Sequence, residues 1–360
     1  MLLAVETSCD ETAVTLLEIG KDTDFILAEY ISSQVKLHQP YGGVVPELAA
    51  REHVINLPVL VDKALSETKL EVKDIEAIAV TRGPGLKGCL LVGVSYCKGL
   101  SRALGVPLIP INHLEGHLWA GFLMPIELQP EYPCLSLVVS GGHTLLILMR
   151  GFREYETLAS TRDDAAGEAF DKVASLLGLP YPGGPALSRE AEKGDRTRYP
   201  LPIGMAKDLS SFSFSGLKTA VQRLVRDLGK VAFEPQVRAD IAASVEWAIV
   251  RALVDKSMEH IKSRAEKPKS FLLTGGVAAN GFLRKTFAEA LSTSGIKFCV
   301  PSHRWCTDNA SMIGVLGKGI FERQRDTFRT WSVSNKSPLE LGPGVLASIG
   351  VSPRFPIGSD

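Results

Sequence analysis

One pattern recurs in this chain and constrains its fold: an apolar segment, a tight polar turn and a second apolar segment. It occurs twice, at residues 4–12 and 138–144. Short β-like runs alternate with helical runs around both copies, which predicts an α/β protein. A chain of 360 residues is long for one domain, so we expect two lobes. Backbone N–H groups in such turns can hold an anion without a Walker-type lysine.

Hydrophobic periodicity and turn residues indicate where the elements lie. Strands are expected at 2–6, 12–19, 25–32, 75–81, 107–111, 134–140 and 144–149, and helices at 46–68, 165–177, 235–263 and 310–321. A Gly/Pro turn is expected at 181–185. Prolines within 121–133 break either periodicity, so this segment is the expected crossing between lobes. The expected division is an N-terminal lobe over 1–125, a C-terminal lobe over 126–330 and an extension over 331–360 that packs back on the lobes.

The chain has no net charge to attract a polyanion, because 40 basic residues balance 40 acidic ones. Any nucleic acid must therefore be bound by a local patch or with the help of a partner. The stretch 189–226 is the candidate patch, since its arginines and lysines, Lys207 among them, are interleaved with Tyr199, Phe212 and Phe214. Phosphate contact with base stacking fits this composition. A solvated face fits it equally well.

Composition also bears on the compartment. The six cysteines form no Cys-x-x-Cys pair, and several lie in apolar runs, where buried thiols are common. The first six residues read as a buried strand rather than a signal peptide. Uncharged apolar runs in the sequence are too short to cross a bilayer. A cytoplasmic protein without membrane association is expected.

Two histidines four residues apart, His113 and His117, follow the strand expected at 107–111. On a helix both imidazoles face the same way and can bind one metal ion. The alternative is that one histidine caps the helix and the other packs in a core. Zinc proteases need His-Glu-x-x-His, whereas Glu115 stands two residues after His113 and points away from the shared face. A protease is therefore disfavoured.

A third turn, at 273–280, joins an expected strand to an expected helix. Its amides, together with the helix dipole, could hold a nucleotide. A tight structural turn explains any one glycine pair equally well. Three turns that each follow an apolar strand, spread over two lobes, favour a nucleotide cleft.

Together these segments resemble the TsaD family of bacterial and organellar tRNA N6-adenosine threonylcarbamoyltransferases, formerly called O-sialoglycoprotein endopeptidases. The resemblance is carried, in order along the chain, by the motifs at 6–12, 42–47, 113–117, 140–144, 163–171, 212–218 and 306–310. It implies a two-lobed actin-like (ASKHA) fold with a nucleotide cleft between the lobes. It also implies transfer of a threonylcarbamoyl group from threonylcarbamoyl-AMP to N6 of the adenosine 3′ of the anticodon, in tRNAs that read codons starting with A.

The resemblance implies a metal site of His113, His117 and Asp308. Such a set suits Fe²⁺, which is favoured, or Zn²⁺. Asp308 could instead cap the helix expected from Ala310. The implied ligand is threonylcarbamoyl-AMP, or ATP or ADP with Mg²⁺. The residues implied to bind it are Val138, Val139, Ser140, Gly141, Gly142, Asp171, Gly184 and Asn280. Some family members carry an acid where this chain has Ser188, which leaves one ribose contact open.

The adenosine amine is a poor nucleophile and must lose a proton, so a carboxylate base is expected near the first turn. Glu11 is the preferred candidate and Asp10 the second. The alternative is that both belong to a solvated turn or a backbone cap. Cys9 is not expected to act as a nucleophile, because an acyl-phosphate anhydride does not require one. A sugar kinase and a non-catalytic nucleotide-binding scaffold are the rival functions on the same fold.

The resemblance also implies partners. These are tRNA, a TsaB-like paralogue on the first lobe, a TsaE-like ATPase, and a TsaC-type synthase that supplies threonylcarbamoyl-AMP. Organellar relatives form homodimers instead. The sequence does not decide between the two arrangements.

Overall fold

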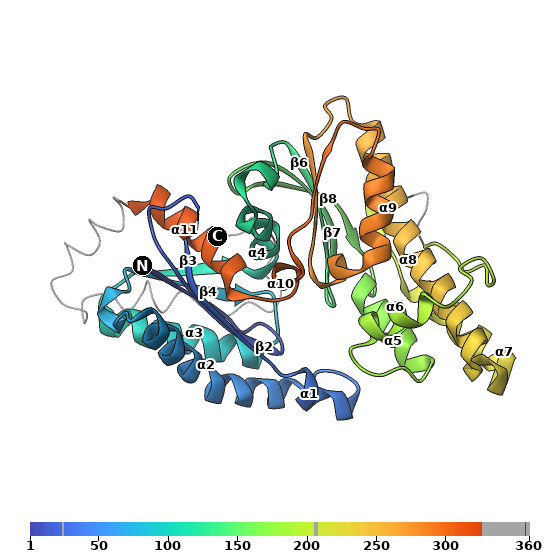
Figure 1. The fold of residues 1–360 in the computed structure, drawn as a ribbon, viewed down its shortest axis with the longest axis horizontal. Helices are drawn as coiled ribbons and strands as arrows, with labels where there is room; N and C mark the ends of the chain where they lie inside the picture. The colour runs from blue at the N-terminus through green and yellow to red at the C-terminus, as the bar shows by residue number, and fades with distance from the viewer. Residues whose placement is uncertain (24, 205–207, 326–356, 358–360) are drawn as a thin grey trace. The chain divides into compact units, whose positions relative to one another are not determined.

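The computed structural model describes residues 1–23, 25–204, 208–325 and 357, which form two units (Figure 1). Unit 1 contains Met1–His38, Val44–Glu127 and the described residues from Asp308 onward, and unit 2 contains Gln39–Gly43 and Leu128–Thr307. The chain crosses between them inside 121–133. Residues 308–325 belong to unit 1, not to the C-terminal lobe as expected. Of the extension expected at 331–360, the structure describes only residue 357. Lys207 also lies outside the described residues.

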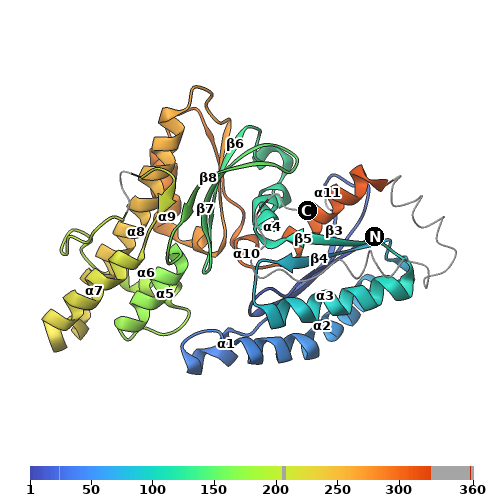
Figure 2. The same cartoon turned by 180° about the vertical axis from the view of Figure 1, so that it is seen from behind.

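Unit 1 is built on a mixed sheet of five strands in the order β3-β2-β1-β4-β5. The strand β1 pairs antiparallel with β2 and parallel with β4. The strands are β1 (Leu2–Glu6), β2 (Glu11–Leu17), β3 (Ile26–Ser33), β4 (Ala77–Gly83) and β5 (Leu108–Asn112). Helices α2 and α3 cover one face and α4 and α11 the other (Figures 1 and 2). The helices are α1 (Val35–His38), α2 (Pro46–Thr68), α3 (Lys87–Leu104), α4 (His113–Trp119) and α11 (Ala310–Arg323).

The alternation of side chains along β1 decides which residues reach which face. Leu3 and Val5 belong to the core shared with α2 and α3. The intervening residues face α11, which lies very close: a Cβ added at Gly314 would be 3.1 Å from the Cβ of Ala4 and 2.3 Å from Leu17. Glu6 continues the Ala4 series, so its carboxylate points to the α4 and α11 side of the sheet.

Unit 2 repeats this arrangement with β6 in the central place. The sheet order is β11-β10-β6-β7-β8-β9, with β6 antiparallel to β7 and parallel to β10. Its strands are β6 (Cys134–Val139), β7 (Thr144–Gly151), β8 (Glu154–Thr161), β9 (Ser211–Phe212), β10 (Ser270–Thr274) and β11 (Lys297–Cys299). Its helices are α5 (Ala166–Leu176), α6 (Gly183–Ala191), α7 (Ser215–Leu228), α8 (Pro235–Ser263), α9 (Gly281–Leu291) and α10 (His303–Cys306).

The two sheets therefore share one topology, an antiparallel meander on one side of the central strand and parallel strands on the other. In unit 1 the order is β3-β2-β1-β4-β5, and in unit 2 the corresponding order is β8-β7-β6-β10-β11. The α/β prediction is confirmed, and the recurring pattern in the sequence marks the two central hairpins.

Two local expectations are wrong. The segment 181–185 is not only a turn, because α6 begins at Gly183. Pro185 lies in its first turn, where a helix does not need the missing N–H. Phe212 and Phe214 are each only 1% exposed in the unit 2 core, so neither ring is available to stack on a base.

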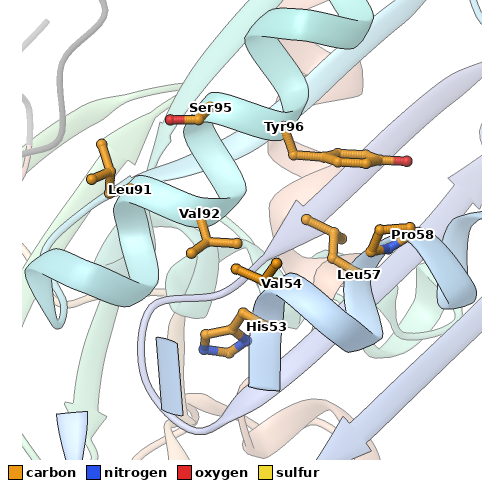
Figure 3. A pocket seen from close by; sticks show the side chains of 8 residues that line it. All are labelled: His53, Val54, Leu57, Pro58, Leu91, Val92, Ser95 and Tyr96. Carbon is orange, nitrogen blue, oxygen red and sulfur yellow. The ribbon is translucent and has the colours of Figure 1, made fainter. Parts of the chain in front are cut away.

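The outer faces of α2 and α3 form an apolar groove of about 400 Å³ (Figure 3). Aliphatic side chains at its rim are exposed, Val54 by 58% and Leu91 by 54%. The groove is lined by His53, Val54, Leu57, Pro58, Leu91, Val92, Ser95 and Tyr96. Among the described residues, helices that combine the length and apolarity of a membrane span are absent.

Candidate metal centre and nucleotide-binding turns

The histidine pair lies at the start of α4, directly after β5. Asn112 caps this helix, because its side-chain oxygen accepts hydrogen bonds from the backbone N–H of Leu114 (2.8 Å) and Glu115 (3.4 Å). The rings of His113 and His117 meet edge to face, with centroids 4.7 Å apart. Both imidazoles therefore face the same way, and the capping alternative is wrong because Asn112 supplies the cap.

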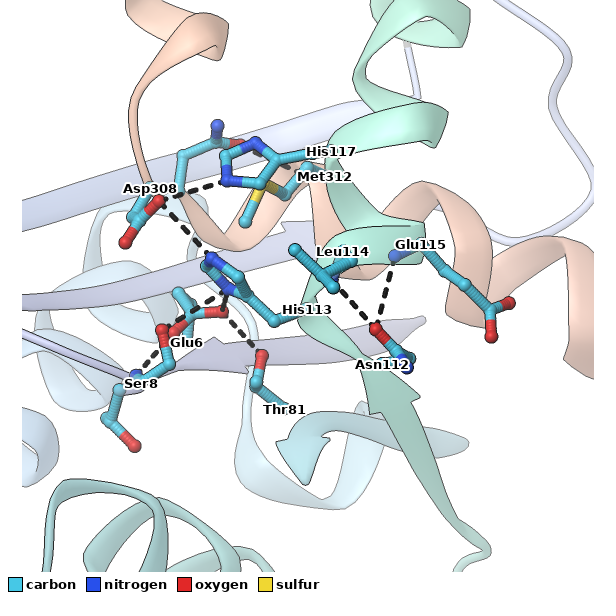
Figure 4. Close-up of polar contacts among 12 residues, drawn as sticks. Glu6, Ser8, Thr81, Asn112, His113, Leu114, Glu115, His117, Asp308 and Met312 are labelled. Atoms are coloured by element: carbon cyan, nitrogen blue, oxygen red, sulfur yellow. Dashed lines mark hydrogen bonds and ion pairs between the residues drawn. The ribbon is translucent and has the colours of Figure 1, made fainter. Parts of the chain in front are cut away.

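Asp308 completes a three-residue cluster (Figure 4). Its Oδ1 lies 3.5 Å from Nε2 of His113 and 3.2 Å from Nε2 of His117. The cap of α11 is Asn309, whose Oδ1 accepts from the N–H of Met312 at 2.9 Å. Asn309 therefore fills the capping position, and Asp308 directs its carboxylate at the two histidines.

Glu6 holds His113 from the opposite side. Its Oε2 is 3.0 Å from Nδ1 of His113 and accepts a hydrogen bond from Thr81 at 2.5 Å. Since a carboxylate accepts, Nδ1 carries the proton and Nε2 can present a lone pair toward Asp308 and His117. Metal-binding histidines commonly have such a carboxylate behind them. Glu6 was not predicted as a site residue, because the alternation of side chains along β1 is the one feature of the sequence that points to it.

The pKa values of His113 and Glu6 depend on the charges of their neighbours in this cluster. Burial alone would lower the pKa of His113, but the carboxylates of Asp308 and Glu6 outweigh it and raise this pKa to about 9. For Glu6, burial acts to raise the pKa, and the charge and hydrogen bond of His113 more than reverse it. A metal ion binds the neutral imidazole, so metal binding here releases a proton.

The donor set fits a divalent transition metal. The three candidate ligand atoms lie within 4.8 Å of one another, and two imidazole nitrogens with one carboxylate suit Fe²⁺ or Zn²⁺. Glu115 does not take part, because its carboxylate points away from this set (Figure 4). The protease geometry is therefore missing from this cluster, in agreement with the histidine spacing.

The turn between β1 and β2, together with the first residue of β2, carries two carboxyl groups, Asp10 and Glu11, in unit 1, the unit that also contains the His-His-Asp cluster. Asp10 and Glu11 are adjacent at the start of β2, and the hydroxyl of Ser33 donates to Oε1 of Glu11 at 3.4 Å. Burial, with the charges of Asp10 and Asp308 added, holds the pKa of Glu11 well above its usual range. Burial likewise raises the pKa of the Cys9 thiol well above its ordinary value, with help from Asp10 and Asp308. A thiol that stays protonated is a poor nucleophile, which agrees with the expectation for Cys9.

In unit 2, the turn after β6 is a closed loop. The N–H of Ser140 donates to the carbonyl of His143 at 2.8 Å, and Gly141 and Gly142 at its tip are exposed. The side chains of Val138 and Val139 are fully buried. These valines can support the turn, but their side chains are not accessible to a ligand.

The turn after β10 lies against the one after β6. Gly275 has φ +92°, and a Cβ there would lie 2.4 Å from the carbonyl oxygen of Val139. Only glycine fits this close approach in a left-handed conformation. Asn280 follows as the cap of α9, where its oxygen accepts from the N–H of Leu283 at 2.7 Å.

The remaining predicted nucleotide residues are joined through α6. The N–H of Gly184 donates to Oδ1 of Asp171 at 3.1 Å. One turn later, Ser188 accepts from the amide of Asn280 at 2.8 Å, and the same amide donates to Glu246 at 2.7 Å. Glu246 is a buried carboxylate on α8 that was missed because it sits within the apolar stripe of that helix. Asp171, Gly184 and Asn280 thus belong to one connected region of unit 2.

Two sheets of the same topology, one carrying a His-His-Asp cluster and the other glycine turns, define a two-lobed protein of the actin-like class. A family model described as TsaD, tRNA N6-adenosine threonylcarbamoyltransferase, matches residues 25–315. The chain belongs to this family.

Individual relatives agree with the family assignment. The chain is 48% identical to the tRNA N6-adenosine threonylcarbamoyltransferase of Synechococcus sp. (strain JA-3-3Ab) over 95% of this chain and 90% of that protein. It is 50% identical to the protein of the same name from Anaeromyxobacter sp. (strain Fw109-5), over 89% and 95% of the two chains. The crystal structure of T. kodakarensis HypF is similar in fold, with a TM-score of 0.55 at 17% identity, over 89% of this chain and 48% of that one.

Proposed function

We propose that this chain transfers the threonylcarbamoyl group from threonylcarbamoyl-AMP to N6 of adenosine 37 of tRNA, in the cytoplasm. The observation that carries the proposal is the cluster of His113, His117 and Asp308, backed by Glu6, in a member of the TsaD family. These three side chains would hold one Fe²⁺ or Zn²⁺ ion. When bound, the metal supplies a Lewis acid for a phosphate or carbonyl oxygen.

The protein's own groups would then mainly position the reactants, because AMP is already a good leaving group. Glu11 would accept the proton of the adenosine amine, since its raised pKa makes it a stronger base than an ordinary carboxylate. The turns after β6 and β10 would bind the nucleotide through backbone N–H groups. Asp171 would accept hydrogen bonds from ribose hydroxyls.

Transfer of labelled threonine into tRNA tests this function. The purified chain is supplied with threonylcarbamoyl-AMP, with and without partner proteins, and the modified nucleoside is quantified. Label on adenosine 37 supports the proposal. If no label appears under any partner condition while the protein is folded and metal-bound, the proposal is rejected in favour of a nucleotide-binding scaffold.

Gly184→Ala tests the nucleotide region without disturbing the fold. A Cβ at Gly184 would meet only the Cβ of Phe170, at an ordinary 3.9 Å, so the protein itself has room for it. We expect a nucleotide placed here to lose about 10-fold in affinity, which corresponds to about 1.4 kcal/mol, with an unchanged melting temperature. Calorimetric titration with AMP and ATP measures this. Gly216→Ala in the same unit, which meets no atom within 4 Å, is the control, and equal affinity for both variants would contradict the placement.

The apolar groove on α2 and α3 would receive the TsaB-like paralogue. Exposed aliphatic residues that gather on one face mark interaction surfaces, and the family implies a partner on this lobe. We expect Leu91→Glu to weaken a heterodimer at least 10-fold. Leu128→Glu, on unit 2 with the same 54% exposure, serves as the matched control. Sedimentation with the paralogue measures the effect, and loss of self-association instead would assign the groove to a homodimer.

The TsaC-type synthase would supply the substrate, and the TsaE-like ATPase would act on the assembled complex. For tRNA, the exposed cations of 189–226 would contact phosphates. The patch is smaller than its composition indicates: Arg196 stacks on the ring of Phe282 at 4.1 Å, and Arg226 pairs with Asp227 at 3.2 Å. Arg189 and Arg223 remain exposed to solvent.

A further inference from the structure

We infer that His53 is a positioning residue for the carboxyl pair Asp10 and Glu11. Its ring lies 2.9 Å from the carbonyl oxygen of Cys9 through Nε2 and 2.8 Å from the hydroxyl of Thr12 through Nδ1. Cys9 comes directly before Asp10, and Thr12 directly after Glu11. One imidazole therefore holds both ends of the pair. The inference rests on the proposed function in that it assigns these carboxyl groups to the transfer reaction.

The hydrogen bonds fix the form of the ring. A carbonyl oxygen can only accept, so Nε2 of His53 carries the proton and donates to Cys9. Nδ1 then accepts from the Thr12 hydroxyl. His53 is fully buried, and this burial lowers its pKa below the ordinary value. The ring is neutral at physiological pH, with each nitrogen committed to one partner.

The residues just before the pair are held by a different helix. The hydroxyl of Thr7 donates to the carbonyl of Cys89 at 3.0 Å, and the N–H of Leu86 donates to the carbonyl of Ser8 at 2.8 Å. These contacts fix the turn where β1 ends, on the α3 side. His53 joins α2 by hydrogen bonds to the two residues that flank the carboxyl pair, and it lies at the groove of Figure 3.

Substitutions separate positioning from folding. His53→Ala removes both hydrogen bonds, and we expect kcat for transfer to fall about 10- to 100-fold, since displacement of a reacting group by about 1 Å has such effects. The two hydrogen-bond partners of His53, Cys9 and Thr12, are neither candidate metal ligands nor predicted nucleotide-binding residues, so KM for threonylcarbamoyl-AMP and one metal per chain should be retained. His53→Gln keeps a donor for the Cys9 carbonyl and should recover part of the rate.

Two threonines of β2 provide a matched pair. Thr12 and Thr15 are both fully buried, but Thr15 bonds to Ser311 at 3.1 Å and does not contact His53. We expect Thr12→Val to lower kcat and Thr15→Val to leave it within about 2-fold, even if both lower the melting temperature. An equal loss of kcat in the two threonine variants would show a structural role only and overturn the inference. The same conclusion would follow if His53→Ala lowered kcat, raised KM and lost its metal together.

The positioning role of His53 can also be tested by a measurement that does not depend on transfer activity. In the crystal structure of His53→Ala, we expect residues 9–12 to shift by about 1 Å or more, with a smaller shift in His53→Gln. An unshifted turn in His53→Ala refutes the positioning role whether or not the wild-type protein is active. If the turn shifts in His53→Ala but the wild-type protein shows no transfer activity, the proposed function is refuted and the positioning role of His53 is not.

Discussion

Alanine in place of His113 is expected to abolish metal binding and transfer together. The substitution removes one of the three proposed ligands and leaves the buried carboxylate of Glu6 and the half-buried carboxylate of Asp308 without the imidazole between them. Loss of an outer partner alone typically costs 10- to 100-fold in metal affinity, so loss of the ligand should exceed about 100-fold. Metal per chain, measured by mass spectrometry, and the initial rate of tRNA modification report the two effects.

His303→Ala is the matched control for this experiment. His303 is an exposed histidine on α10 in unit 2, and its removal should change neither metal content nor rate. The metal assignment would be wrong if His113→Ala kept one metal per chain while the protein stayed folded. Full metal content with lost activity would place His113 in the reaction in another role.

Glu11→Gln is expected to lower kcat by about 100- to 10,000-fold, the range typical of a lost general base. The amide matches the carboxyl group in shape but cannot take up a proton at neutral pH. Because Glu11 is not one of the three metal ligands, metal content should not change. Single-turnover transfer with saturating threonylcarbamoyl-AMP isolates the step, and Asp10→Asn is the comparison. A larger loss in Asp10→Asn than in Glu11→Gln would reassign the base to Asp10.

The pH dependence gives a second test of the same residue. A base works in its deprotonated form, and the pKa of Glu11 is raised, so the rate should rise with pH through this elevated pKa. The acid limb of the wild-type profile should thus lie at higher pH than an ordinary carboxyl group would place it. In Glu11→Gln this limb should disappear. A wild-type profile that is flat down to the ordinary range of a glutamate would contradict the assignment.

The sequence predicted the features that depend on local pattern. Alternating apolar runs located the central hairpins of both sheets, and the four-residue spacing of His113 and His117 is sufficient to place both rings on one side of a helix. The role of Asp308 came instead from the family resemblance, because its spacing from Ala310 fitted a helix cap equally well. The structure removed that alternative by showing Asn309 in the cap.

What could not be predicted depends on contacts between distant segments. Glu6 and His113 are 107 positions apart, and His53 and Cys9 are 44 apart, so no local period brings them together. The burial of Phe212 and Phe214 likewise depends on how α7 packs on the core of unit 2. Periodicity identifies an amphipathic element, but it does not identify the partner that covers it.

The discontinuous course of unit 1 has a consequence for the order of events on the ribosome. The strands of unit 1 and both histidines are synthesised before Leu128–Thr307, the main part of unit 2, and Asp308 and α11 follow only after that. Folding during synthesis generally starts from the N-terminal part, yet here that part lacks both the third proposed ligand and the helix that packs on Ala4 and Leu17. A nascent chain halted before residue 308 carries the two histidines but cannot form the complete donor set. Completion of the proposed metal site therefore has to wait until Asp308 has been translated, after both units have been largely synthesised.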